Sequence, residues 1–303
     1  MRISFVGGAT DIENYYSKYG GEVVSCAINK YIYVTLNKRD DDKIVVSYTK
    51  TESVDTVEQV QHEIVREALK MAEITKGIEI HIIANISTIG TGLGGSSAVA
   101  VGVLKALFPD KTNYDIAGMA CELEIKRLGK CIGKQDQYAC AMGGLNHILF
   151  HEEGEVDIEG IENIDNCINE RLQNKMFLVK INNNGFIRRA ETILKHQNDL
   201  DNTETLHKIK YLCNDFHGSL FGKSDMEISR LINHYWRLKR TLSDYVSNKN
   251  IDNIINLFIF YGCGAKLCGA GQSGFIFVYD PSGITCKGIP VEIDYEGCII
   301  TQL

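Results

Sequence analysis

A glycine-rich loop between an expected strand and an expected helix constrains the fold of this chain more than any other feature. The loop, G-T-G-L-G-G-S-S-A at residues 90–98, follows the β-branched, alternating run 78–84 and leads into the apolar run 99–108. Glycines permit positive φ and close backbone approach, and a helix start presents unpaired N–H groups at the positive end of its dipole. The segment therefore predicts a cradle for phosphate groups.

The loop does not fit two common phosphate-binding patterns. A P-loop has lysine directly after its second glycine, where this chain has Ser96 after Gly95. A dinucleotide fingerprint has an acidic residue at a strand end about 20 residues further on, whereas residues 113–124 have a helical pattern. A plain glycine turn with Ser96 as helix N-cap is the alternative that the loop alone leaves open.

Composition is that of an ordinary globular protein. The 303 residues suffice for one large domain or two of common size, with 44% hydrophobic and 23% charged residues. The net charge of −7, without a basic block, argues against nucleic acid as a partner. No apolar run has the length of a membrane span and no leader pattern follows Met1, so we expect a cytoplasmic monomer or homodimer without membrane contact.

The cysteines and histidines lack the spacing of common metal sites. Ten cysteines occur without a C-x-x-C pair, and the eight histidines show no H-x-x-x-H pattern. Most of the cysteines lie inside apolar runs. We therefore expect reduced, buried thiols in place of disulfides or a metal centre.

Alternation and helical spacing predict strands and helices in both halves of the chain. The expected strands are 2–6, 23–28, 31–36, 43–48, 78–84, 176–181, 275–279 and 297–302. The expected helices are 56–74, 99–108, 114–128, 188–197, 203–221, 226–247 and 250–261. A polar stretch at 162–174 divides the halves, so we expect domains at residues 1–170 and 171–303.

Phosphoryl transfer needs a metal ligand, a base or charge near the acceptor oxygen, and a cation for the developing charge. Candidates are Glu124 in an expected helix, Asp136 beside a glycine turn, Arg2 at the start of the first strand, and Asp11 after a turn. Each candidate has a plainer explanation. Glu124 could pair with Arg127 or Lys126 on a helix face. Asp136 could cap a helix, and Arg2 could end a strand in solvent.

Three segments resemble, in order, the motifs of the GHMP kinases (galactokinase, homoserine kinase, mevalonate kinase and phosphomevalonate kinase). They are R-I-S-F-V-G-G-A-T-D at 2–11, G-L-G-G-S-S-A at 92–98 and K-L-C-G-A-G at 266–271. The resemblance implies a two-domain α+β fold, with a ribosomal-S5-like N-terminal part that carries the nucleotide loop and a ferredoxin-like C-terminal part. It also implies ATP and Mg²⁺ as cofactors.

Further segments are similar to the subgroup that phosphorylates D-glycero-D-manno-heptose 7-phosphate in bacterial surface-sugar pathways. They are Y-G-G at 19–21, I-N-K-Y at 28–31, G-K-Q-D-Q-Y-A at 133–139, N-G-F-I-R at 184–188 and W-R-L-K-R at 236–240. This likeness implies transfer to the C1 hydroxyl, giving the 1,7-bisphosphate. The alternatives are a fucose- or galactose-type sugar 1-kinase, a non-catalytic ligand-sensing relative, and a decarboxylase of the same fold, which the acceptor-side motifs do not favour.

The resemblance also implies roles for individual residues. Ser96, and less directly Ser97, would ligate Mg²⁺ with Glu124, while Asp136 would face the acceptor hydroxyl as base or orienting charge and Arg2 would steady both Asp136 and the transferred phosphoryl group. The backbone expected to hold ATP phosphates is that of Gly90, Thr91, Gly92, Leu93, Gly94, Gly95, Ser96 and Ser97. The expected substrate-binding residues are Gly8, Thr10, Asp11, Lys134, Arg188 and Gly271.

Two of those substrate-binding assignments concern the sugar phosphate. Lys134 and Arg188 are basic partners for a phosphate group, with surface salt bridges as the alternative.

The chain also departs from the family pattern. Ala9 stands at the third glycine of the first motif, and Gln272 and Ser273 replace two glycines of the third. The added side chains narrow the space beside bound groups, which bears on substrate identity more than on ATP binding.

Overall fold

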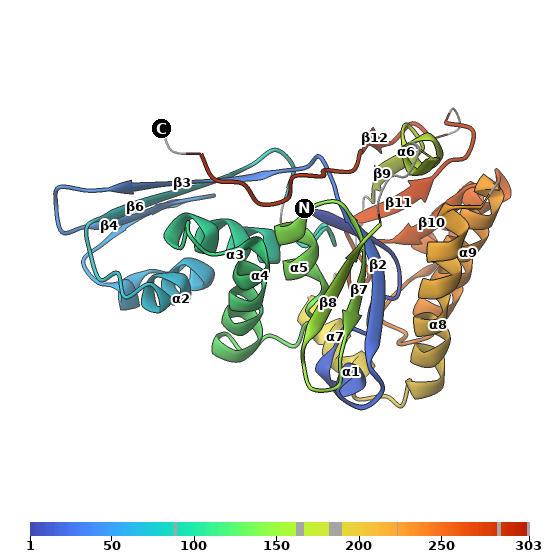
Figure 1. The fold of residues 1–303 in the computed structure, drawn as a ribbon, viewed down its shortest axis with the longest axis horizontal. Coiled ribbons are helices and arrows are strands. Elements are labelled where there is room, and N and C mark those ends of the chain that lie inside the picture. Colours follow the sequence, from blue (N-terminus) through green and yellow to red (C-terminus); the bar gives the residue numbers. More distant parts are fainter. Residues whose placement is uncertain (88–89, 162–166, 182–189, 223, 284–285, 302–303) are drawn as a thin grey trace.

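Three four-stranded sheets form the framework of the protein (Figure 1). The computed structural model describes residues 1–87, 90–161, 167–181, 190–222, 224–283 and 286–301. None of the helices within these ranges has the length and apolar composition needed to cross a lipid bilayer.

The first sheet is antiparallel and carries the first motif. Its order is β1-β2-β7-β8, with bounds β1 Arg2–Val6, β2 Gly21–Ala27, β7 Leu145–Phe150 and β8 Val156–Gly160. Helix α5 (Gln135–Met142) and helix α8 (Thr203–Leu220) both pack on β1 and β2. Because this leaves little of the sheet exposed, β2 is almost entirely buried.

The second sheet has one covered and one open face. Its order is β3-β6-β4-β5, with bounds β3 Ile32–Lys38, β6 Ile78–Ala84, β4 Ile44–Ser47 and β5 Thr51–Val54. Helices α2 (Glu63–Met71) and α3 (Gly95–Leu107) lie on one side of it in Figure 1. Half-buried and exposed residues alternate along β3, because successive side chains of a strand point to opposite faces and only one face of this sheet is covered.

The third sheet belongs to the second half of the chain. Its order is β10-β11-β9-β12, with bounds β10 Gly264–Leu267, β11 Phe275–Tyr279, β9 Met176–Lys180 and β12 Ile289–Pro290. Helices α9 (Asp225–Lys239) and α10 (Lys249–Phe260) pack on β10. The remaining helices are α1 Glu13–Tyr19, α4 Asn113–Cys121, α6 Cys167–Leu172 and α7 Ala190–Asn198.

The hydrophobic core runs across the two halves. Phe5 of β1 stacks on Phe216 of α8 at 5.0 Å between ring centroids and meets Phe277 of β11 edge-on at 5.5 Å. These three rings belong to one cluster of buried side chains. The expected division at residue 170 stays a prediction, and residues on both sides of it share this core.

Several expected elements differ from those observed. The expected helix 56–74 is a 3₁₀ turn at Val57–Gln59 followed by α2, and the expected helix 114–128 is α4 followed by a π-helical turn at Glu122–Arg127. The expected helix 226–247 ends at Lys239. The strand expected at 297–302 is wrong over the described residues 297–301, because the Cys298 N–H donates to the Ala141 carbonyl at the end of α5 and forms no ladder.

Candidate active site

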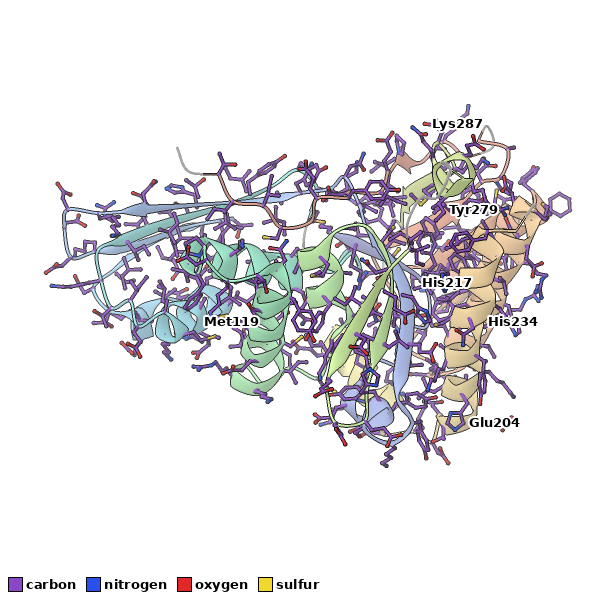
Figure 2. The ribbon with its side chains drawn as sticks, in the orientation of Figure 1. Met119, Glu204, His217, His234, Tyr279 and Lys287 are labelled. Carbon is purple, nitrogen blue, oxygen red and sulfur yellow. The ribbon has the colours of Figure 1, made fainter. Side chains whose placement is uncertain are left out.

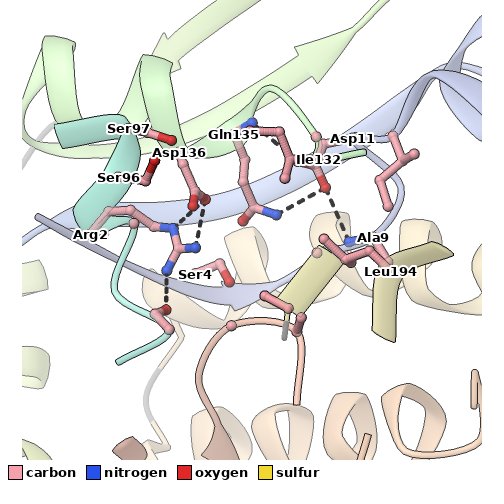
Figure 3. A pocket seen from close by; sticks show the side chains of 18 of the residues that line it. Arg2, Ser4, Ala9, Asp11, Ser96, Ser97, Ile132, Gln135, Asp136 and Leu194 are labelled. Atoms are coloured by element: carbon pink, nitrogen blue, oxygen red, sulfur yellow. Dashed lines mark hydrogen bonds and ion pairs between the residues drawn. The ribbon is translucent and has the colours of Figure 1, made fainter. Parts of the chain in front are cut away.

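A cavity of about 270 Å³ lies where several distant segments of the chain meet, with α7 and α9 also contributing to its lining (Figure 3). The segments are the first motif, the glycine loop, the stretch from the π-helical turn to the start of α5, and the third motif. Lining residues that the sequence singled out are Arg2, Gly8, Asp11, Glu124, Asp136 and, from the loop, Gly90, Thr91, Gly92, Gly94, Gly95, Ser96 and Ser97.

The glycine loop is held in a conformation that side chains would not permit. Gly92 and Gly94 have φ of 74° and 72°, and α3 begins at Gly95. A Cβ at Gly92 would lie 2.4 Å from the carbonyl oxygen of Cys268, and a Cβ at Gly94 would lie 3.3 Å from Asp136 Oδ2. The backbone therefore passes directly beside the Asp136 carboxylate and leads into a helix N-terminus, which favours bound anions.

The third motif packs against this loop. A Cβ at Gly269 would lie 2.4 Å from Gly92 Cα, so the two glycine segments touch backbone to backbone. The Phe275 N–H donates to the Thr91 carbonyl at 3.2 Å, and Ser273 Oγ donates to the Gly90 carbonyl at 3.3 Å. The third motif thus fixes the position of the loop from the C-terminal half.

Arg2 and Asp136 form an ion pair at one wall of the cavity (Figure 3). Arg2 Nε and Nη2 both lie 2.6 Å from Asp136 Oδ1, and Arg2 Nη1 donates to the Gly92 carbonyl at 2.7 Å. Arg2 is buried, so the alternative of a strand end in solvent is wrong. Burial acts to lower the pKa of Arg2, but the charge and hydrogen bond of Asp136, together with the nearby Cys140 and Cys268, leave that pKa above its usual value.

Glu124 and Ser96 form a second polar group in the same cavity. Ser96 Oγ donates to Glu124 Oε1 at 2.6 Å, and Gln137 Nε2 donates to Glu124 Oε2 at 2.8 Å. Arg127 pairs with Glu122 at 3.1 Å, so a Glu124–Arg127 pair on a helix face is wrong. Glu124 is completely buried in the π-helical turn. Paired carboxylate and hydroxyl oxygens fit a small hard cation such as Mg²⁺.

Asp11 links the first motif to the start of α5 at the cavity. Its Oδ1 accepts from the Ala9 N–H at 3.1 Å and from Gln135 Nε2 at 2.9 Å, and its Oδ2 accepts from the Gln135 N–H at 3.1 Å. Burial raises the pKa of Asp11 above its usual value, and the nearby Asp136 adds to the rise. Among the described residues, Gln135 Oε1 is a buried acceptor without a hydrogen-bond partner.

Comparison with known proteins identifies the family. The GHMP kinases N-terminal domain matches residues 56–144. The D-glycero-alpha-D-manno-heptose 7-phosphate kinase of Campylobacter jejuni is 32% identical, over 93% of this chain and 88% of its own length. The chain belongs to the GHMP kinase family.

Solved structures agree with the fold of this GHMP kinase. A crystal structure of a D-glycero-D-manno-heptose 1-phosphate kinase from Bacteroides thetaiotaomicron has a TM-score of 0.76 at 23% identity, covering 98% of this chain and 95% of its own. A putative sugar kinase from Campylobacter jejuni has a TM-score of 0.70 at 26% identity, covering 98% and 94%. The expected two-domain α+β GHMP fold is confirmed.

Not every residue that the sequence singled out lies at the cavity of this GHMP kinase. Thr10 Oγ1 lies 2.8 Å from the carbonyl oxygens of Gly7 and Glu22, where it braces the first-motif turn. Lys134 Nζ donates to the Gly154 carbonyl at 2.6 Å and lies 4.6 Å from the Tyr16 ring centroid. Neither side chain lines the cavity.

Three further residues that were predicted to bind ATP or substrate also lie outside the cavity lining or outside the described residues. Leu93 is completely buried under the loop, and its carbonyl accepts from the Arg2 N–H at 3.1 Å. Gly271, with φ of 146°, is packed against the backbone of Val246 and does not line the cavity. Arg188 lies outside the described residues. The functional roles of all the site residues stay predictions.

Sequence reasoning missed two lysines that line the cavity. Lys130 Nζ lies 3.2 Å from Ser96 Oγ, 3.5 Å from Glu124 Oε1 and 2.9 Å from Glu63 Oε1. Lys239 Nζ donates to the Leu267 carbonyl at 3.3 Å, and burial lowers its pKa to about 8. Lys239 lies within the W-R-L-K-R segment, which could have drawn attention to it, whereas no pattern in the sequence marks Lys130.

The departures from the family pattern have a conformational cost. Ala9 and Gln272, which stand where the family has glycine, keep positive φ of 83° and 58°. Side chains in this region of φ are strained by contact of Cβ with the following carbonyl. The backbone of both motifs therefore retains a shape suited to glycine.

A second hollow, of about 480 Å³, lies on the far side of the glycine loop. Gly90, Gly95 and Ser96 line both hollows, so the loop forms the wall between them. Tyr48 and His62 line the second hollow, with ring centroids 4.7 Å apart. The loop thus has an aromatic-lined space on one side and the charged cavity on the other.

Proposed function

We propose that this GHMP kinase transfers the γ-phosphoryl group of ATP to the C1 hydroxyl of D-glycero-D-manno-heptose 7-phosphate, giving the 1,7-bisphosphate and ADP. The observation that carries the proposal is the position of the Arg2–Asp136 pair directly against a glycine loop that starts a helix. The choice of acceptor rests on the Campylobacter jejuni relative at 32% identity.

The two hollows suggest where each substrate binds. The adenosine part of ATP would lie in the hollow lined by Tyr48 and His62, whose rings offer stacking surfaces. Its phosphates would cross the loop at Ser96 and meet the N–H groups at the start of α3. The acceptor would occupy the cavity on the other side, so the two substrates meet at the loop.

Ser96 and Glu124 would hold Mg²⁺, which neutralises charge on the phosphate oxygens when bound. Gln137 keeps one oxygen of the Glu124 carboxylate engaged at 2.8 Å and leaves Oε1 directed at Ser96. Lys130 contacts both ligand oxygens and also pairs with Glu63 at 2.9 Å. The ammonium can therefore move toward Glu63 as the metal binds.

Asp136 would orient the acceptor hydroxyl and take its proton. Arg2 engages Asp136 Oδ1, and among the described residues no hydrogen bond reaches Oδ2. That oxygen lies beside Gly94, where the acceptor and the γ-phosphoryl group would meet. The hydroxyl oxygen forms the new P–O bond, the bond to the β-phosphate oxygen breaks, and the proton passes to Oδ2. Positioning and charge supply most of the rate in such transfers.

The first test removes the proposed base. Asp136→Asn should lower kcat by about 10²–10⁴, the usual effect of losing such a group, while ATP affinity stays within a few-fold of wild type. Asp110→Asn, which changes an exposed carboxylate remote from the cavity, is the control and should leave kcat unchanged. Near-normal turnover of Asp136→Asn would overturn the catalytic assignment. Separately, ³¹P spectra of the wild-type product would show whether the new phosphate is on the anomeric carbon.

One observation favours a second candidate, a kinase for an unphosphorylated sugar. Lys134, expected to bind the sugar phosphate, is directed at the Gly154 carbonyl, outside the cavity lining. Turnover with galactose or fucose and none with the heptose phosphate would establish this candidate. Sugar binding without ATP turnover would instead support a non-catalytic relative.

A further inference from the structure

Three side chains capable of binding a metal ion meet behind the first motif, away from the candidate active site. They are Glu22 of β2, His147 of β7 and Cys213 of α8. One ligand atom from each lies within 4.8 Å of the others, and Glu22 Oε2 is 3.1 Å from His147 Nε2. We propose that these residues bind one Zn²⁺ ion between the first sheet and α8.

The distances suit a tetrahedral ion after small side-chain movements. Zn²⁺ bonds of about 2.0–2.3 Å put neighbouring ligand atoms roughly 3.4 Å apart. The Glu22–His147 pair is already near this separation, and the remaining atoms need to approach by at most about 1.4 Å, which rotation about side-chain bonds can provide. A thiolate, an imidazole and a carboxylate form a donor set that favours Zn²⁺ over Mg²⁺ or Ca²⁺.

Charge and second contacts also suit a cation. A second carboxylate, Glu159, places Oε2 3.8 Å from His147 Nδ1, so the ring lies between two acids as in carboxylate–histidine–zinc arrangements. Binding would release the Cys213 proton to solvent, and one thiolate with one carboxylate then balances the ion. Lys210 Nζ is 3.9 Å from the other Glu22 oxygen, and it also donates to the Tyr19 carbonyl, which holds it at the edge of the cluster.

His217 lies beside this cluster. It lies one turn after Cys213 on α8, so both residues face the same side of the helix. The His217 and His147 rings are 5.6 Å apart, and Figure 2 labels His217 where α8 faces the strands. Cys213 and His217 form a C-x-x-x-H spacing, and the other residues of the cluster come from strands about 65 and 190 residues earlier in the chain (positions 147 and 22).

An ion bound at this cluster would support the first-motif turn. A Cβ at Gly7 would lie 2.6 Å from Cys213 Sγ, and Thr10 Oγ1 lies against the Glu22 carbonyl. The cluster thus forms the rear support of the first-motif turn that carries Asp11. An ion here would tie β2, β7 and α8 together directly behind that turn.

Co²⁺ distinguishes this cluster from the oxygen ligands of the active site. Titrating the reduced, metal-free protein with Co²⁺ should produce sulfur-to-cobalt charge-transfer absorption at one equivalent. Ser96 and Glu124 offer no sulfur, so Co²⁺ bound there gives no such band. Zn²⁺ should abolish the band stoichiometrically, whereas a large excess of Mg²⁺ should leave it in place.

Variants assign the ligands. Cys213→Ala should lose the band, His147→Gln should weaken Co²⁺ binding at least tenfold, and Cys298→Ala, the removal of a partly exposed thiol elsewhere, should change neither. Far-ultraviolet circular dichroism checks that each variant is folded. If Cys213→Ala does not fold, His147→Gln decides the question, because it keeps the thiol. Absence of the band in the wild type, or unchanged affinity in His147→Gln, would overturn the proposal.

Discussion

Replacing Arg2 by methionine measures how much the fold depends on the charge pair at the cavity. Methionine keeps much of the apolar stem of arginine but removes the guanidinium that holds Asp136 Oδ1 and the Gly92 carbonyl. Loss of one partner of a buried ion pair costs about 3–5 kcal/mol, because the other charge stays behind unpaired. The Asp136 side chain retains 25% exposure, so water reaches it. We therefore expect Arg2→Met to lower the free energy of unfolding by about 3 kcal/mol, the lower end of that range.

Urea unfolding followed by circular dichroism tests this value. Arg39→Met is the matched control, since Arg39 pairs with Asp41 at the same 2.6 Å but on the surface. Water and salt screen such exposed pairs. The free energy of unfolding of Arg39→Met should therefore fall by only a small fraction of the decrease in Arg2→Met. A double-mutant cycle of Arg2→Met with Asp136→Asn should give a coupling of about 2 kcal/mol. Equal losses in the two methionine variants, or no coupling, would refute the reasoning.

Three other variants test separate features. Ala9→Gly should raise the free energy of unfolding by about 1 kcal/mol, because it relieves a positive φ; an unchanged or lower melting temperature would contradict this. Lys130→Met should tighten Mg²⁺ binding severalfold in calorimetry, since the ammonium lies beside both ligand oxygens; weaker binding would assign Lys130 to the metal site as a support. The pKa of Lys239 is about 8 in the folded protein and 10.5 in the unfolded chain, so between these pH values the unfolded chain binds more protons. The free energy of unfolding of the wild type should therefore rise with pH relative to that of Lys239→Met, by up to roughly 3 kcal/mol. A decrease of this difference with pH would exclude the lowered pKa.

Local features of the fold were accessible from the sequence. The glycine loop was predicted because positive φ at Gly92 and Gly94 is a property of individual residues and their neighbours. Strand β3 was predicted because one face of its sheet is open, which gives alternation. Strand β7 was missed, since it is buried on nearly all sides and its sequence, L-N-H-I-L-F, does not alternate.

Long-range features were accessible only in part. The apolar and β-branched residues at the end of the chain resemble a strand, but pairing depends on a free sheet edge, and the Cys298 N–H donates to a helix carbonyl. The contact of Arg2 with Asp136 joins residues 134 positions apart, and only the family motifs pointed to it. Lys130 follows a π-helical turn, and the spacing of its neighbours does not reveal which side of the cavity it reaches.

The measurement that tests the central claim most directly is ADP release with Mg-ATP across a panel of acceptors. The panel contains D-glycero-D-manno-heptose 7-phosphate, sedoheptulose 7-phosphate, mannose 6-phosphate, fucose, galactose and mevalonate. The account predicts turnover with the heptose 7-phosphate well above every other acceptor, and its loss in Asp136→Asn. Turnover confined to an unphosphorylated sugar would contradict the proposed acceptor, and folded protein without turnover on any member of the panel would contradict the proposed kinase activity.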